Sequence, residues 1–144
     1  MRILVDADAV PVKDIIEDIA KENNIEVTMY IDTSHEYESS YSKVIVVSKG
    51  RDAVDFEIIK DIIKDDIVIT NDYPLASLAL LKGAKSMGFS GLIYTDNNIN
   101  ILLTQRQLNH EFRSHNKKGT KIKKRTKEDN NKFKEALIKL IAMK

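Results

Sequence analysis

Apolar residues along the chain form short continuous runs that alternate with segments of helical periodicity. Continuous runs are typical of strands buried on both faces of a sheet, and they span residues 2–5, 25–31, 43–48, 67–70 and 92–95. Elsewhere apolar residues recur every three or four positions, which predicts helices over residues 12–23, 54–63, 74–82, 98–115 and 127–141. Strands that alternate with helices predict an α/β domain with a mostly parallel five-stranded sheet and helices on both faces.

The length and composition are those of one ordinary domain. The chain has 144 residues, of which 42% are hydrophobic and 31% are charged. Such a chain buries enough surface to need no disulfide or structural metal. It contains no cysteine, which excludes disulfide frameworks, thiolate metal sites and cysteine nucleophiles. The apolar run after Arg2 is too short for a signal peptide or a membrane span, so we expect a cytoplasmic protein without membrane contact.

Charge is distributed unevenly along the chain. Residues 1–104 carry 10 Lys and Arg against 18 Asp and Glu, whereas residues 105–144 carry 13 against 4. We expect residues 1–115 to form the α/β domain, and residues 116–144 to form a basic loop and a C-terminal helix that packs on the same domain. A basic segment of this kind is either a solvated surface or a contact for an extended anion such as nucleic acid.

Five aspartates follow the predicted strands at the points where those strands end. Asp6 and Asp8 follow the first strand, Asp52 and Asp55 the third, and Asp72 the fourth. The carboxyl ends of parallel strands meet at one edge of a sheet, so we expect the five side chains to converge, two of them on one face of a helix's first turn. Taken singly, each is better explained as a helix cap, and only their convergence argues for more. Converging carboxylates repel one another until protonation, a basic side chain or a cation relieves them.

The expected cluster offers only oxygen ligands, which suits Mg²⁺ or Mn²⁺. Such an ion lowers the pKa of bound water and binds phosphate oxygens, which indicates phosphodiester hydrolysis. We expect Asp6 and Asp72 to be the first ligands, Asp8 and Asp55 the next, and Asp52 a ligand or a support for one. The same residues, apart from Asp52, are the expected catalytic groups.

Six segments spread over nearly the whole chain carry a family resemblance. They are Asp6–Pro11, Ser34-His35, Gly50–Asp55, Asp66–Ala76, Lys82-Gly83 and the spaced Thr126, Asp129 and Phe133. In their order and spacing they resemble the YaiI/YqxD family of uncharacterised bacterial proteins. The resemblance implies a PIN-like α/β fold with strand order 3-2-1-4-5, related to metal-dependent nucleases. It also implies that the acidic residues of the family correspond to the five aspartates above.

Hydroxyl, imidazole and basic side chains near the expected cluster are candidates for contacts with a phosphate backbone. Ser34 and His35 follow the second strand on the same edge, and Thr70 is placed to cap or orient the aspartate that follows it. Arg106 and Arg113 lie two helical turns apart and share a helix face. The remaining candidates are Lys117, Lys118, Lys121, Lys123, Lys124 and Arg125. Attraction of this kind ignores sequence and weakens with salt, so it does not separate RNA from DNA. Few aromatic residues lie among these bases, which argues against a platform for stacked single strands.

The sequence therefore predicts a metal-dependent nuclease, and two alternatives stay open. Asp6 and Asp8 after a buried strand, followed later by Thr70, also resemble motifs of haloacid-dehalogenase phosphatases. In such an enzyme Asp6 would attack phosphorus and Asp8 would protonate the leaving group. The later acidic pair that binds Mg²⁺ in those enzymes is missing here. The other alternative is a non-catalytic nucleic-acid-binding protein that keeps the fold and the basic tail.

Overall fold

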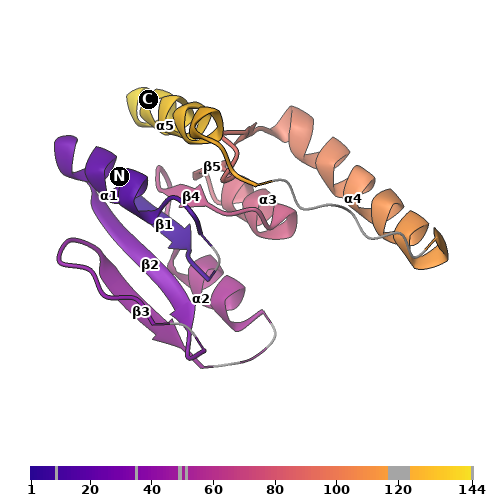
Figure 1. The fold of residues 1–144 in the computed structure, drawn as a ribbon, viewed down its shortest axis with the longest axis horizontal. Helices are drawn as coiled ribbons and strands as arrows, with labels where there is room; N and C mark the ends of the chain where they lie inside the picture. Colours follow the sequence, from indigo (N-terminus) through magenta and orange to yellow (C-terminus); the bar gives the residue numbers. More distant parts are fainter. Residues whose placement is uncertain (9, 35, 49, 51, 117–123, 144) are drawn as a thin grey trace.

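The computed structural model describes residues 1–8, 10–34, 36–48, 50, 52–116 and 124–143. These residues form one sheet flanked by helices (Figure 1). The strands are β1 (Arg2–Asp6), β2 (Glu26–Asp32), β3 (Lys43–Val47), β4 (Ile67–Ile69), β5 (Lys85–Met87) and β6 (Ile93–Tyr94). The helices are α1 (Lys13–Glu22), α2 (Ala53–Asp61), α3 (Tyr73–Leu81), α4 (Asp96–Asn116) and α5 (Lys127–Ala142). The sheet order is β3-β2-β1-β4-β5-β6, and only β5 and β6 pair in antiparallel fashion among these strands.

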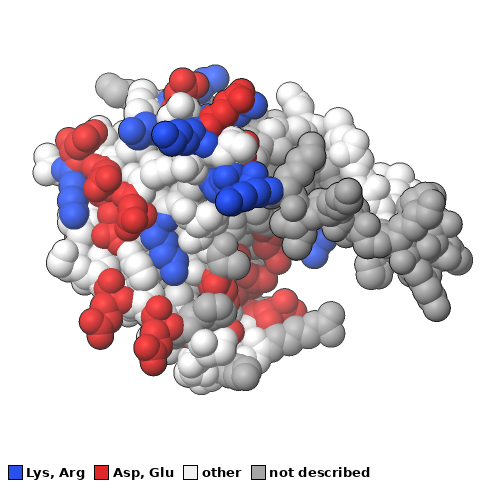
Figure 2. Space-filling view, viewed as in Figure 1, with Lys and Arg blue, Asp and Glu red and all other residues white. Residues whose placement is uncertain are grey.

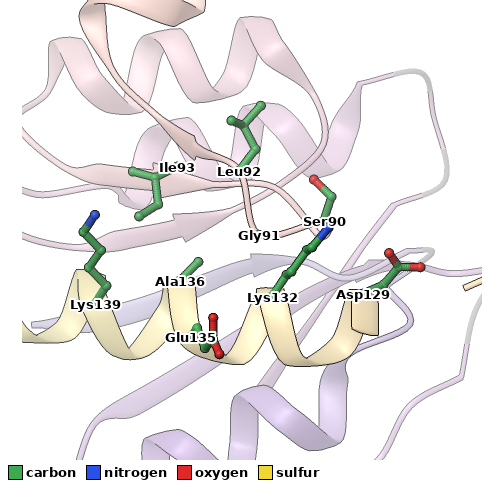
Figure 3. A pocket seen from close by; sticks show the side chains of 9 residues that line it. All are labelled: Ser90, Gly91, Leu92, Ile93, Asp129, Lys132, Glu135, Ala136 and Lys139. Carbon is green, nitrogen blue, oxygen red and sulfur yellow. The ribbon is translucent and has the colours of Figure 1, made fainter. Parts of the chain in front are cut away.

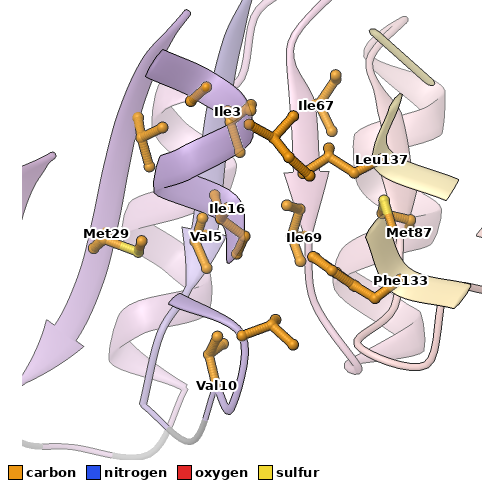
Figure 4. Packing of buried hydrophobic residues seen from close by; sticks show 14 of the residues in the cluster. Ile3, Val5, Val10, Ile16, Met29, Ile67, Ile69, Met87, Phe133 and Leu137 are labelled. Carbon is orange, nitrogen blue, oxygen red and sulfur yellow. The ribbon is translucent and has the colours of Figure 1, made fainter. Parts of the chain in front are cut away.

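Helices cover both faces of the sheet because the central strands are apolar on both sides. In β1, Ile3 and Val5 belong to one apolar layer and Leu4 to the other. On the first face, α1 and α5 pack over the strands with buried residues that include Ile16 and Phe133 (Figure 4). On the second face, α2 and α3 pack around Leu4, and α4 packs on the outside of α3. Two covered faces are what a continuous apolar strand requires.

The predicted fold class is confirmed, with one strand more than expected. The apolar run at 92–95 forms β6, a two-residue antiparallel strand, and not the fifth parallel strand. The parallel place beside β4 belongs to β5, whose middle residue Ser86 interrupts any apolar run. Ser86 is buried there because its hydroxyl donates a 2.8 Å hydrogen bond to the carbonyl oxygen of Val68. The predicted order 3-2-1-4-5 is therefore correct for its first four strands, but the predicted fifth strand lies one place further out, as β6, with β5 between it and β4.

The helix ends follow local hydrogen bonding. Helix α4 begins two residues earlier than predicted because the Thr95 N–H donates to Asn98 Oδ1 at 2.9 Å and the Asn98 N–H donates to Thr95 Oγ1 at 3.1 Å. Helix α5 begins after Thr126, whose side chain forms the predicted cap as part of a capping box with Asp129. Helix α5 then packs on α1 and β5. No helix within the described ranges is long and apolar enough to cross a membrane.

Candidate functional site

The ends of β1 and β4 lie side by side and bring Asp6 next to Thr70. The two strands pair in parallel with Val5 opposite Ile69, so the residues that follow leave the sheet together. The Thr70 hydroxyl donates a 3.0 Å hydrogen bond to Asp6 Oδ2 and accepts one of 3.0 Å from the backbone N–H of Asp72. Thr70 is fully buried. Its hydroxyl therefore fixes the position of the Asp6 carboxylate relative to the backbone of Asp72.

Asp72 and Asp52 both stand at helix N-termini, but only Asp72 caps its helix. Asp72 Oδ1 accepts a 3.1 Å hydrogen bond from the Leu75 N–H, which satisfies a free amide at the start of α3. Asp52 precedes α2 with a left-handed backbone (φ 61°) and makes no side-chain cap. The prediction that Asp52 and Asp55 share one face of a helix's first turn is therefore wrong. Only Asp55 lies in that turn, while Asp52 is exposed just before it.

Asp6, Asp55 and Asp72 come together although they lie on three different elements. Burial and the negative charges of Asp72 and Asp6, with a side-chain hydrogen bond to Asp72, raise the pKa of Asp55 to about 7. Burial also raises the pKa of Asp6, and the charges of Asp8 and Asp72 contribute. Like charges raise one another's pKa only when they are close and poorly compensated. The electrostatics therefore identify this edge of the sheet as a place where the negative charges of several described aspartates lie close together.

This edge gathers oxygen donors without forming a ready-made metal site. No three Asp, Glu or His side chains in the described part of the chain are placed to hold one ion. No Lys or Arg of that part forms an ion pair with Asp6, Asp55 or Asp72 either. Among the described residues, protonation relieves part of this repulsion, in line with the raised pKa of Asp55. In its chemistry, an all-carboxylate donor set fits a hard divalent cation.

Asp8 connects this edge to the end of β2. Its Oδ1 accepts a 2.9 Å hydrogen bond from the backbone N–H of Asp32, the last residue of that strand. The Asp32 carboxylate in turn accepts hydrogen bonds from the N–H of Ser34, at 2.8 Å, and from its hydroxyl. Sequence reasoning missed Asp32, although it stands where an apolar run ends, which is the criterion that selected the other aspartates. His35 lies outside the described residues.

A pocket of about 290 Å³ opens beside the carboxylates. Its polar lining comes from Asp52, Asp55, Asp72 and Arg106, so α4 brings one predicted substrate contact to the same place. Its apolar lining comes from α2 and α3, namely Phe56, Ile59, Pro74, Leu75 and Leu78. A second pocket, of about 580 Å³, lies between α5 and the turn before β6, and none of the five predicted aspartates lines it (Figure 3). The smaller pocket is therefore the one that adjoins the site.

The other predicted cationic contacts are only partly described. Arg113 lies in α4, and Lys124 is exposed before α5. Arg125 Nε donates a 2.6 Å hydrogen bond to Asn130 Oδ1, which ties this side chain to the start of α5. The remaining predictions lie outside the described residues: Lys117, Lys118, Lys121 and Lys123. Basic side chains are mixed with a few acidic ones over α5, at the top of Figure 2, whereas acidic side chains dominate over α1 and the lower half.

Without divalent cations, the contribution of Asp55 to the stability of the protein should fall as pH rises from about 4 to about 7. The pKa of Asp55 is near 7 when folded and 3.8 for an isolated aspartate side chain, so across this window the native state binds more protons than the unfolded state. We expect Asp55→Asn to be about 1–2 kcal/mol more stable than wild type at pH 8. This free-energy difference is reduced because the carboxyl group is partly exposed to solvent. Near pH 4 the two proteins should be equally stable. Urea denaturation in EDTA measures this, with Asp18→Asn as an exposed control on α1. Lower stability of Asp55→Asn at pH 8 would contradict it.

Comparison with known proteins places the chain in a family. The model of the "Uncharacterized BCR, YaiI/YqxD family" matches residues 4–143. A "UPF0178 protein" of Lachnoclostridium phytofermentans is 50% identical over 144 residues, which cover 98% of this chain and 97% of that protein. A "UPF0178 protein" of Ruminiclostridium cellulolyticum is 49% identical over 141 residues, covering 98% of this chain and 92% of its own. No solved structure gives a significant match. The resemblance found in the sequence is confirmed, and the chain belongs to the YaiI/YqxD family.

Proposed function

We propose that this protein is a divalent-metal-dependent nuclease that hydrolyses phosphodiester bonds in RNA or DNA. The observation that carries the proposal is the approach of Asp6, Asp55 and Asp72 from β1, α2 and α3, which raises the pKa of Asp55 to about 7. This repulsion opposes folding at neutral pH, because the raised pKa means that the charged form of Asp55 is less stable in the folded protein. A carboxyl group with a strongly shifted pKa beside a pocket marks a candidate functional site, and Mg²⁺ or Mn²⁺ is the cation that suits oxygen donors.

In this proposal Asp6, Asp55 and Asp72 are the residues that would hold the cation, after their side chains shift from positions that are not yet placed to share one ion. When bound, Mg²⁺ or Mn²⁺ lowers the pKa of a coordinated water and stabilises charge on phosphate oxygens. Thr70 keeps the Asp6 carboxylate in position through its 3.0 Å hydrogen bond and so limits how far that ligand can turn. Arg106, in the lining of the adjoining pocket, is the side chain that would bind a phosphate oxygen of the substrate.

Nucleic acid is the proposed substrate because of the charge of the C-terminal part of the chain. Residues 105–144 carry 13 Lys and Arg against 4 Asp and Glu, a balance that attracts a polyanion without regard to its sequence. Asp8 and Asp52 lie beside the three proposed ligands and contribute to the negative potential there. The resemblance to PIN-like nucleases points in the same direction. A cytoplasmic location, expected for a chain without cysteine, belongs to the same proposal.

The proposal is tested by incubating the purified chain with labelled single-stranded and double-stranded RNA and DNA, in Mg²⁺, Mn²⁺ or EDTA. We expect shortened products with either cation and none in EDTA. A small phosphate monoester is included as a second substrate. Release of phosphate from the monoester without cleavage of nucleic acid would replace the nuclease by a phosphatase. Binding of nucleic acid without cleavage in any metal would leave only a binding protein and overturn the proposal.

A further inference from the structure

The pocket beside Asp55 and Asp72 combines groups that suit different parts of a nucleotide. Its wall from α2 and α3 is apolar, and Phe56, which follows Asp55 directly, is 69% exposed. Leu78, 40% exposed, lies in the lining from α3. A large aromatic side chain left in water costs solvation free energy that burial would recover. Phe56 is thus a free aromatic face beside the carboxylates.

We propose that Phe56 stacks on an unpaired nucleobase of the substrate strand. This inference rests on the proposed nuclease function and names the form of nucleic acid that the site takes. The base would lie against Phe56 and Leu78, while its backbone phosphate contacts Arg106, which α4 contributes to the same lining. Stacking on an aromatic ring tolerates every base because each has a π-face, and a guanidinium binds phosphate oxygens by charge-assisted hydrogen bonds.

Only an unstacked base can use this surface. In a duplex both faces of each base are covered by the neighbouring pairs, and exposing one requires unstacking energy. A single strand, a loop or a strand end offers its base face freely. The volume of about 290 Å³ is at the small end of ligand pockets, roughly 300–1,000 Å³, which suits one nucleotide unit and not a duplex. The preferred substrate is therefore single-stranded.

The aromatic ring can be tested separately from catalysis by measuring binding in EDTA, where no cleavage is expected. Fluorescence anisotropy is measured with a labelled single strand, the same strand with abasic positions, and the matching duplex. We expect Phe56→Ala to bind the normal single strand roughly 5- to 150-fold more weakly than wild type, the range of one lost base stack. Binding of the abasic strand should not change. Phe56→Tyr, which keeps a ring, should restore binding.

The control variant is Leu81→Ala, because Leu81 is 80% exposed on α3 and does not line the pocket. Its affinity for all three ligands should equal that of wild type. The inference would be overturned if Phe56→Ala and Leu81→Ala lost the same affinity, or if Phe56→Ala lost the same affinity for normal and abasic strands. It would also be overturned if wild type bound the duplex more tightly than the single strand. If the protein still cleaved nucleic acid with Mg²⁺ or Mn²⁺ in that case, the nuclease proposal would stand without the Phe56 subsite. Base-dependent binding through Phe56 without cleavage in Mg²⁺ or Mn²⁺ would support the subsite and reject the nuclease.

Discussion

Replacing Asp6 or Asp72 by asparagine should reduce metal-dependent cleavage at least about 10- to 100-fold, since loss of a ligand costs no less than loss of its supporting contacts. Both substitutions preserve the local structure. An asparagine at position 6 still accepts the hydrogen bond from Thr70, and one at position 72 still caps α3 through Leu75. What is removed is negative charge, and with it the affinity for a divalent ion. The kcat for a labelled oligonucleotide in Mn²⁺ measures the effect.

A second measurement separates loss of the metal from loss of the fold. The pKa of Asp6 is raised in the folded protein, chiefly by burial, so its charge opposes folding at neutral pH. Asp6→Asn should therefore unfold no earlier than wild type in EDTA at pH 8. Mn²⁺ should raise the melting temperature of wild type, because it binds the folded state, and should raise that of Asp6→Asn less. Asp18→Asn should behave as wild type in both measurements. Full cleavage activity of Asp6→Asn would rule out Asp6 as a metal ligand.

Replacing Arg2 by methionine should destabilise the protein by about 2–3 kcal/mol, less than the roughly 3–5 kcal/mol for breaking a fully buried ion pair, because the Arg2 side chain is 32% exposed. Asp66, whose side chain is only 1% exposed, faces Arg2. The Arg2 guanidinium donates to Asp66 Oδ1 at 3.1 Å and to Oδ2 at 2.7 Å, and also to the carbonyl oxygen of Asp61 at 2.9 Å. Without Arg2, the buried carboxylate keeps the hydrogen bond from the N–H of Ile63 at 3.0 Å but loses its countercharge. Urea denaturation at pH 7 measures the loss.

The double variant Arg2→Met/Asp66→Asn tests the cause. An amide at position 66 carries no charge and still accepts the hydrogen bond from Ile63, so the double variant should recover part of the stability lost in Arg2→Met. Lys60→Met is the control, because Lys60 forms an exposed pair with Glu57 at 2.8 Å and its removal should not change the denaturation midpoint measurably. A double variant less stable than Arg2→Met would show that the loss arises from packing and not from the unpaired charge.

Much of the candidate site was predictable because it follows from strand ends. Parallel strands with a known order carry whatever follows them to one edge, so Asp6 and Asp72 were placed together by topology alone. Thr70 bridges them only because β1 and β4 pair in a particular register. The apolar runs in the sequence do not specify that register. Asp32 obeys the same edge rule and joins the network through Asp8, although the sequence-based prediction did not include it.

Features carried by the packing of helices could not be predicted in the same way. Arg106 reaches the pocket only because α4 crosses the outside of α3, and the angle of that crossing depends on side chains far apart in the chain. In the sequence Phe56 is one more apolar position of a helix, yet it is exposed because α2 buries Val54 and Ile58 instead. The basic character of residues 105–144 is visible at once, but most of the loop that carries it, 117–123, lies outside the described residues.

By itself the sequence determined the alternation of strands and helices, the α/β class and the family, because periodicity and apolar runs are local properties that burial must satisfy in any fold. Tertiary structure alone decided that Ser86 fills a core position, that β6 turns back along β5, and that Phe56 and Arg106 share a pocket with the carboxylates. The physical reason is the same in each case. These outcomes depend on contacts between residues distant in the chain, and such contacts are set by how the elements pack and not by the preference of any one segment.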